Sequence, residues 1–434
     1  MSVESATYIS QLNSALPAAG DLISEGDNHL NLIKATLLAT FPNFTATAIT
    51  PTSADVNKIA GAATTGATGF NVVTQAATDN TTLAASTAQV QAAIMASSGV
   101  TAGLPAQSGN SGKYLYTDGS NAAWQYTPTG FRNRIINGGM AIDERNAGAA
   151  QTITAAAALA YCVDRWYAYC TGANVTGQRV AGTLQSQYRY QFTGAASVTA
   201  IGFAQRIETT NSYDLNGQTC MLSVDLANSL LTTVTWAAYY ANTADTFGTL
   251  ASPTRTAIAS GSFTVTSTIT RYSTSISVPS AAITGIEIVF AVGAQTSGTW
   301  TIGNAQLEKG AVASEFETRP ITTEQDLCAR YLPVTRGYYL AGQCYATNSA
   351  YVGCSFNVPA RVAPTGLTLS AAVGSYKLTN ATISTTVCNG ISFGAASVGG
   401  GTAACTLATN PLVAGNATML EVGTNRILWT GSEL

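Results

Sequence analysis

Charged residues are scarce in this chain. Lys, Arg, Asp and Glu make up 9% of its 434 residues, whereas an average soluble domain has about 25%. The net charge is −3, and Lys and Arg do not cluster as nucleic-acid binding requires, so we expect no nucleic-acid partner. No window approaches the ~20 apolar residues of a membrane helix, and no basic N-terminal region precedes an apolar run. We therefore expect a soluble chain made in a cytoplasm, without membrane insertion.

Motifs for common enzyme chemistry are also missing. The one histidine, His29, falls on the polar side of an expected helix, which leaves the β-rich remainder without a base for a Ser-His-Asp or Cys-His site. No G-x-x-x-x-G-K-[ST] phosphate loop occurs. Histidine and cysteine lack the close spacing of zinc ligands. We expect no metal, no cofactor and no catalytic residue, and thus a protein that is not an enzyme.

The cysteines are scattered and include no C-x-x-C pair. In a chain of this length they are more often small buried apolar residues than disulfide partners. Cys344 and Cys354 are the pair that a hairpin would bring face to face. The eight positions are Cys162, Cys170, Cys220, Cys328, Cys344, Cys354, Cys388 and Cys405.

Paired carboxylates are the remaining enzymatic possibility, because a glycosidase needs two Asp or Glu side chains at a suitable separation. Asp225 and Glu287 fall on the outward phase of expected strands, where solvated carboxylates belong, so a structural role is favoured. The candidates are Asp143, Glu144, Asp164, Asp214, Asp225 and Glu287.

Helical periodicity marks the N-terminal part. Residues 21–42 predict a helix with a capping box of Ser24 and Asp27. One stripe of this helix carries Leu30, Ile33, Leu37 and Phe41. A second short helix is expected over 52–59. A third, over 83–95, carries Leu83, Val90 and Ile94.

None of these stripes has a partner within the chain, because the segments between them, 61–82 and 97–130, are rich in Gly, Ser, Thr and Ala. Short isolated helices are marginal in water. We therefore expect packing against identical chains, as in a coiled coil or helical bundle, with a thin intertwined stalk or extended linker between the helices. A dimer stays open, since it is the commonest symmetric oligomer.

The composition becomes β-like near residue 131. Apolar residues alternate with polar ones in several short runs separated by Gly, Ser, Thr and Asn, which is typical of an antiparallel sandwich with one buried and one wet face. The fold class expected is mainly β, with a jelly-roll-like antiparallel β-sandwich. The runs are Tyr188/Tyr190/Phe192, Leu222/Val224/Leu226, Val234/Trp236/Ala238/Tyr240 and Ile286/Ile288/Phe290/Val292.

The last hundred residues form a further β-rich region, with strands expected around 338–345 and 350–358 and a flexible, glycine-rich segment at 394–405. This region is either a small β domain or the closing part of the sandwich. Four parts follow: a helical segment 1–60, a stalk 61–130, a β-sandwich 131–331 and a C-terminal β region 332–434.

Aromatic residues offer the best functional candidates. Sugar rings present apolar C–H faces to aromatic planes, and the chain has 19 Tyr and 5 Trp. Trp166, Trp236 and Trp300 fall on inward phases or at strand starts and are expected in the core. Tyr167, Tyr169 and Tyr239 are candidate carbohydrate-binding residues.

Charge is concentrated in FRNRIINGGMAIDERNAG, residues 131–148. The Gly138-Gly139 pair lacks the strand-loop-helix context of a phosphate cradle, since β strands follow it. Three stretches together resemble a β-sandwich module of bacteriophage tail fibres that is regarded as carbohydrate-binding. They are this charged cluster, DRW at 164–166, and TIGNAQLEKGAVASEFETRPITTEQDLCARY at 301–331. The N-terminal TYISQLNSALPAAGDLISEGDNHLNLIKATLLATFPN resembles the virion-proximal segment of such fibres.

The resemblance implies a homotrimeric tail fibre on the virion exterior. Residues 1–60 would attach to other tail or collar proteins, and the β domains would recognise a glycan of the bacterial surface. It also implies that the 131–148 charges make structural pairs. Two alternatives remain: a purely structural collar or head fibre or decoration protein without receptor binding, and a surface-polysaccharide depolymerase. The depolymerase ranks last, because no regular β-helix repeat is present.

Overall fold

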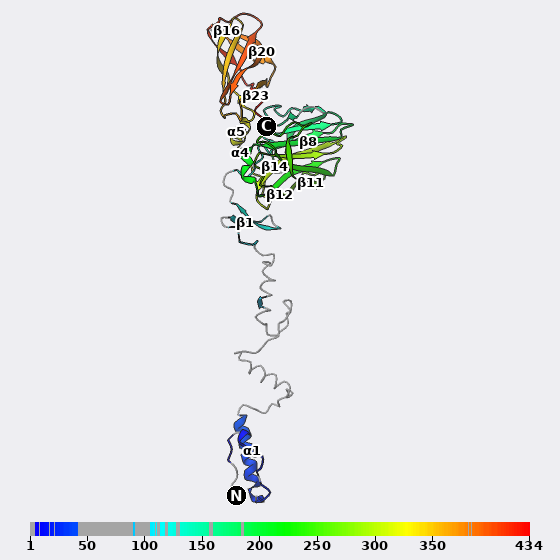
Figure 1. Ribbon diagram of the computed structural model, residues 1–434, viewed down its shortest axis with the longest axis vertical. Helices are drawn as coiled ribbons and strands as arrows, with labels where there is room; N and C mark the ends of the chain where they lie inside the picture. Colours follow the sequence, from blue (N-terminus) through cyan, green and yellow to red (C-terminus); the bar gives the residue numbers. More distant parts are fainter. Residues whose placement is uncertain are drawn as a thin grey trace. The chain divides into compact units, whose positions relative to one another are not determined.

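The computed structural model describes residues 5–7, 9–16, 18–20, 22–41, 90–91, 105–108, 110, 113–117, 120–126 and 131–434, apart from 156–158, 184–185, 381 and 383. The chain divides into two compact units, residues 1–103 and 104–434 (Figure 1). In the described part, no helix is long and apolar enough to cross a membrane.

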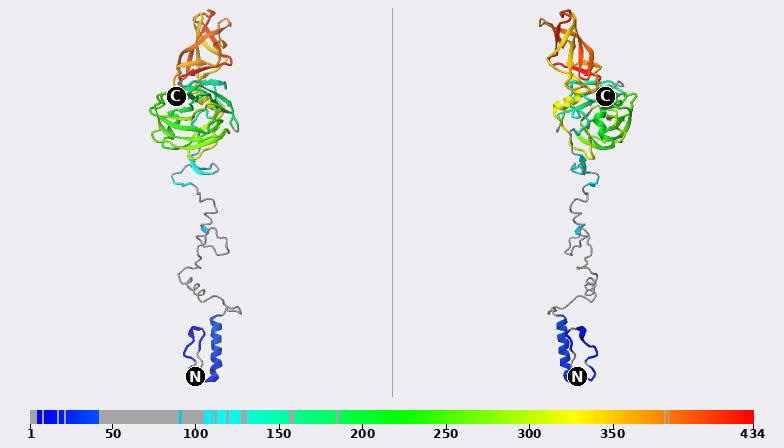
Figure 2. Two further views of the ribbon diagram at one scale, coloured as in Figure 1. Left: turned by 90° about the vertical axis from the view of Figure 1, so that its right-hand side faces the viewer. Right: turned by 60° about the vertical axis from the view of Figure 1, so that its left-hand side comes forward.

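The N-terminal unit contains the helix α1 (Gly26–Thr40), preceded by the short 3-10 helices η1 (Ile9–Gln11) and η2 (Ile23–Glu25). Figure 2 shows the segment before η2 running alongside α1. The Thr36 hydroxyl lies 3.5 Å from the carbonyl oxygen of Ala6, and the Ile9 amide donates to the Thr40 hydroxyl at 3.0 Å. The chain therefore covers the face of α1 that carries Thr36 and His29, both of which are buried.

Two expectations for this helix are wrong. His29 is buried beneath the preceding segment and not on a solvated face. The capping box is absent because Ser24 lies inside η2. The residue that caps α1 is Glu25, which makes no side-chain capping hydrogen bond. The predicted stripe, Leu30, Ile33, Leu37 and Phe41, is exposed.

Several predictions lie outside the described residues: the helix over 52–59, most of the helix over 83–95 with Leu83 and Ile94, and the segment 61–82. Val90 is described, is helical and is exposed. The stretch 97–130 contains an antiparallel hairpin of β1 (Lys113–Thr117) and β2 (Ala122–Tyr126).

Two six-stranded antiparallel sheets form the sandwich, and the chain crosses between them repeatedly after β8, as in a jelly roll. We call one of them the β14 sheet. Its strands, in spatial order, are β12 (Thr270–Ser277), β9 (Thr219–Asn228), β14 (Thr299–Lys309), β7 (Tyr188–Thr193), β6 (Val175–Ala181) and β3 (Gln151–Ile153). The β8 sheet contains β11 (Arg255–Thr264), β10 (Thr233–Ala241), β13 (Ile286–Val292), β8 (Ala200–Ile207), β5 (Tyr167–Thr171) and β4 (Ala160–Tyr161). The predicted mainly-β, jelly-roll-like fold class is confirmed.

Aromatic rings from both sheets stack in the core. Phe203 of β8 lies between Trp166, with ring centroids 4.6 Å apart, and Tyr190 of β7, at 5.1 Å. Phe192 of β7 stacks on Trp300 of β14 at 5.1 Å. Burying one large apolar side chain contributes about 1.5–3 kcal/mol, so this stack holds the two sheets together. The three predicted core tryptophans are all buried.

The expectation of one wet face is wrong for the central strands. β8, β9, β13 and β14 are buried along almost their whole length. Asp225 and Glu287 do point outward, but both are buried, because arginines on other strands of the same sheet pair with them. A side chain that points away from the core of the sandwich is therefore not always exposed to solvent in this protein.

The C-terminal region, called the C-terminal domain below, has an apolar core separate from that of the sandwich, within the same compact unit. After α5 (Ile321–Ala329), six strands close a barrel and three make a small sheet. The barrel order is β16 (Tyr339–Ala346), β17 (Ser349–Ser355), β21 (Gly400–Leu407), β20 (Thr385–Ser397), β19 (Lys377–Thr379) and β22 (Ala417–Glu421). The small sheet contains β15 (Val334–Thr335), β23 (Ile427–Thr430) and β18 (Gly366–Leu369). Short helices are α4 (Thr209–Ser212), η3 (Tyr213–Leu215) and η4 (Val373–Ser375).

The glycine-rich segment 394–405 is not a flexible loop but most of the β20–β21 hairpin. One of its glycines has a packing role. A Cβ on Gly401 would lie 2.3 Å from the Trp429 ring, so only glycine leaves room for this buried indole. All eight cysteines are buried and free, and Cys344 pairs in register with Ala350 rather than facing Cys354.

The charged stretch 131–148 makes structural pairs, as the resemblance implied, and they reach the C-terminal domain. Glu144 pairs with Arg336 and with Arg426, the latter at 2.6 Å. Arg145 pairs with Glu433 at 2.9 Å. The sequence prediction had not included these distant partners.

The last residues of the chain are held by arginines. The Glu433 carboxylate also pairs with Arg165, whose side chain is almost fully buried. Arg206 donates to the Leu434 carbonyl oxygen at 2.9 Å, and Arg361 donates to that of Glu433 at 2.7 Å. Residues 432–434 thus link the sandwich and the C-terminal domain.

We predict that Glu433→Ala lowers the free energy of unfolding by about 3 kcal/mol, because it leaves the buried Arg165 guanidinium without its carboxylate. Urea unfolding of the full chain measures the change. Glu421→Ala, which removes a 3.9 Å pair with the half-exposed Lys377, serves as the control and should cost less than about 1 kcal/mol. Equal losses in the two variants would contradict the assigned role of Glu433.

A second prediction concerns pH. Burial raises the pKa of Asp164 to about 7; Arg145 opposes this shift, and Glu144 and Glu433 add to it. The folded protein therefore binds this proton more tightly than the unfolded chain, whose Asp pKa is about 3.9, so stability is lost as pH rises from about 4 to 7. Relative to the natural chain, Asp164→Asn should gain about 2–3 kcal/mol between pH 5 and pH 8 in urea unfolding. A pH-independent difference would contradict this.

Candidate functional site

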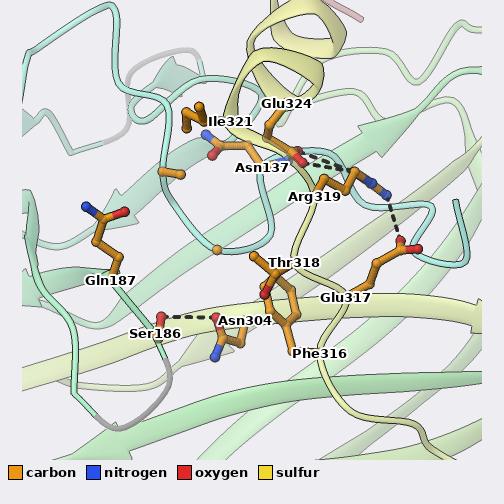
Figure 3. A pocket seen from close by; sticks show the side chains of 12 residues that line it. Asn137, Ser186, Gln187, Asn304, Phe316, Glu317, Thr318, Arg319, Ile321 and Glu324 are labelled. Atoms are coloured by element: carbon orange, nitrogen blue, oxygen red, sulfur yellow. Dashed lines mark hydrogen bonds and ion pairs between the residues drawn. The ribbon is translucent and has the colours of Figure 1, made fainter.

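A cleft lies against the outer side of the β14 sheet. It consists of two cavities, of about 280 and 370 Å³, that share the lining residues Asn304, Phe316 and Thr318. We call this the Phe316 cleft. The first cavity is drawn in Figure 3, where Ser186 and Asn304 lie on one side, Asn137 and Glu324 on the other, and Thr318 between them.

Asn304 reaches the cleft because β14 bulges. The pairing of β14 with β9 shifts register between Gly303 and Gln306, and Asn304 adopts a positive φ of 46°, which asparagine tolerates better than most residues. Its amide nitrogen donates to Asp225 at 2.9 Å, and its oxygen accepts from the Ser186 hydroxyl at 3.1 Å. The side chain is therefore held in one orientation at the junction of the two cavities.

Phe316 belongs to the segment between β14 and α5, and its ring is half-buried. A Cβ on Gly139 would lie 3.3 Å from the ring, so the ring packs directly on the backbone there. The next residue anchors the segment: the two oxygens of Glu317 accept from the amides of Arg132 and Asn133 at 3.0 and 2.9 Å. The charged stretch that begins at residue 131 thus positions the aromatic wall of the cleft.

The floor of the first cavity is an ion-pair network (Figure 3). The buried Arg319 guanidinium lies 3.5 Å from Glu317 and 3.3 Å from Glu324. Glu324 also accepts from the backbone amide of Asn137, which has a positive φ of 56°. Both carboxylates of this cavity therefore have structural partners.

The second cavity is lined by two arginines and an aspartate from three strands of the β14 sheet, β7, β9 and β12. Asp225 pairs with Arg189 at 2.9 Å through one oxygen and with Arg271 at 3.1 Å through the other. Burial lowers the pKa of Arg189; Asp225 opposes this shift, and the like charge of Arg271 adds to it. The two guanidiniums share one carboxylate.

The tyrosines selected from the sequence lie elsewhere, together on the outer face of the β8 sheet. Tyr167 is fully buried, and its hydroxyl donates to Glu287 at 2.5 Å. Tyr169 lies over Gly202, and the Arg255 guanidinium lies 4.0 Å from the centre of the Tyr239 ring. Of the three, only Tyr169 and Tyr239 present surface to a ligand.

Sequence reasoning missed the cleft residues. Asn304, Phe316 and Thr318 all fall within the stretch 301–331 that carries the family resemblance, so the resemblance could have pointed to these residues as candidates for the site. No sequence pattern marks Arg189 and Arg271 as cleft residues, because only the pairing of strands in the folded sheet brings both side chains to one carboxylate. In the described residues, no group of His, Cys, Asp and Glu is arranged to hold a metal ion.

No protein-family model and no curated protein matches the sequence. Among solved structures, the enzymatically active domain of tailspike protein 4 from bacteriophage CBA120 is 19% identical, with a TM-score of 0.27, over 41% of this chain. The chain spans about a fifth of that structure, 21%. A CBM4 structure is 15% identical, with a TM-score of 0.26, over 40% of this chain and 97% of the other.

TmCBM61 in complex with β-1,4-galactotriose is 12% identical, with a TM-score of 0.27, over 41% of this chain and 99% of the other. Scores this low carry no conclusion about function. The fold class rests on the strand pairing, and the candidate site rests on its own geometry.

Proposed function

We propose that the β-sandwich binds a carbohydrate of the bacterial surface in the Phe316 cleft, and that the chain is a subunit of a bacteriophage tail fibre. The binding proposal rests on the half-buried Phe316 ring, which lines both cavities of the cleft together with polar side chains. An aromatic plane matches the apolar face of a sugar ring, and amide, hydroxyl and guanidinium groups around it match the hydroxyls. The resemblance of residues 131–148 and 301–331 to modules of phage fibres supports the proposal that the chain is part of a tail fibre.

We propose binding without cleavage. A glycosidase needs one carboxylate as general acid and another as base or nucleophile. Glu317, Glu324 and Asp225 instead accept hydrogen bonds from backbone amides or pair with arginines. A polysaccharide incubated with the protein should therefore show no new reducing ends, and their appearance would favour the depolymerase alternative.

The binding proposal predicts that Phe316→Ala weakens binding at least 10-fold, because it removes the aromatic wall, while leaving the chain folded. An array of bacterial surface polysaccharides probed with the full chain measures the change. Tyr239→Ala is the matched control, since it removes an aromatic side chain from the outer face of the other sheet. A loss confined to Tyr239→Ala would move the site to the tyrosine face and contradict the cleft assignment.

We further propose that residues 1–60 attach to other virion proteins and that the chain is a homotrimer on the particle exterior. The exposed side chains of Leu30, Ile33 and Leu37 support self-association, because they form an apolar surface on one side of α1 that another copy of the chain can cover. Antibody labelling of virions separates a tail location from a collar or head location.

The trimer predicts a mass by light scattering of three times 44.5 kDa. Leu37→Asp with Phe41→Asp should lower the mass by removing two apolar side chains from the stripe. Asn31→Asp with Ala35→Asp adds the same charge to exposed positions away from the stripe and should leave the mass unchanged. A monomeric natural chain at micromolar concentration would contradict the trimer.

A further inference from the structure

The second cavity of the Phe316 cleft contains a group of paired charges. Arg189 and Arg271 both pair with Asp225, and no other carboxylate pairs with either of them in the described residues. Arg189 is 2% exposed, whereas the side chain of Arg271 is 30% exposed and borders the cavity. Two buried or half-buried cations therefore share one paired carboxylate, whereas the second carboxylate of the cavity, Glu315, is exposed to solvent and pairs with neither of them.

Hydrogen-bond donors in this group are also unsatisfied. The Nε of Arg189 and the Nη2 of Arg271 are buried and have no hydrogen-bond partner. A buried donor without a partner costs about 1–3 kcal/mol, and nearly all buried polar groups in native proteins are paired. Both residues line a cavity of about 370 Å³, which has room for one sugar unit beside Phe316.

One carboxylate of this cavity faces solvent. Glu315 also lines this cavity, its side chain is exposed, and no arginine or lysine pairs with it in the described residues. Asp225 is different, because both of its oxygens are already occupied by Arg189, Asn304 and Arg271. An incoming anion would therefore meet both the Arg271 guanidinium and the Glu315 carboxylate in this cavity.

We propose that this cavity binds the carboxylate of an acidic sugar, a uronic or sialic acid unit, so that the protein selects acidic over neutral glycans. A guanidinium presents parallel N–H donors whose geometry matches a carboxylate, and such charge-assisted hydrogen bonds are about twice as strong as neutral ones. Arg271 is the contact residue, and Arg189 supplies buried positive charge behind it. This inference rests on the proposed function of the Phe316 cleft.

The test uses the full chain and capsular polysaccharides that contain uronic or sialic acid, each paired with its own carboxyl-reduced form. The reduced form keeps the linkages and ring sizes and lacks only the charge. We expect at least 10-fold tighter binding of the acidic form. Arg271→Gln should abolish this preference, so that the variant binds the acidic and the reduced form equally well.

Glu315→Gln is a second variant that carries little folding risk, since its side chain is exposed. It should increase affinity for the acidic form about 2- to 5-fold and leave the reduced form unchanged, because it removes a repelling charge from the cavity. Equal binding of both forms by the natural chain, or a preference unaffected by Arg271→Gln and Glu315→Gln, would overturn this inference and leave the cleft proposal intact. Binding of neither form to any polysaccharide would overturn the proposed function itself.

Discussion

A buried guanidinium must have a carboxylate within reach, and this chain meets that requirement with a large part of its few charges. Removing charge from water is costly unless a partner and further hydrogen bonds replace the lost hydration. Arg165 with Glu433, Arg206 with Glu287, and Arg319 with Glu324 are all pairs of this kind. Each joins segments that are distant in sequence or lie on different elements, so the pairs determine which strands and loops meet once the apolar core has formed.

The cleft depends on the same pairs. Glu317 holds the amides of residues 132 and 133, and Arg319 lies between Glu317 and Glu324. Together they fix the segment that carries Phe316 against the entry of the sandwich. Backbone amides at the start of the stretch 131–148 thus position the aromatic wall, and the side chains of Glu144 and Arg145 pair with residues of the C-terminal domain.

Much of the fold could be predicted from period-two alternation, since residues such as Leu222, Val224 and Leu226 face one core. The burial of Glu287 could not, because alternation reports the direction of a side chain and not the arginine that covers it. The glycines of 394–405 predict a flexible segment, whereas Gly401 leaves room for the buried Trp429 ring, a contact that the sequence pattern does not report. The tyrosine candidates followed from residue type alone, whereas the cleft required the β14 bulge at Asn304, a backbone feature with no sequence pattern of its own.

The central claim is that a sugar occupies the Phe316 cleft, and a crystal structure of the protein with a bound oligosaccharide tests it most directly. The account predicts a sugar ring against the face of Phe316, with hydroxyls near Asn304 and Thr318 and the neighbouring unit toward Arg271. A sugar bound against Tyr169 and Tyr239 on the β8 sheet, with the Phe316 cleft empty, would contradict it.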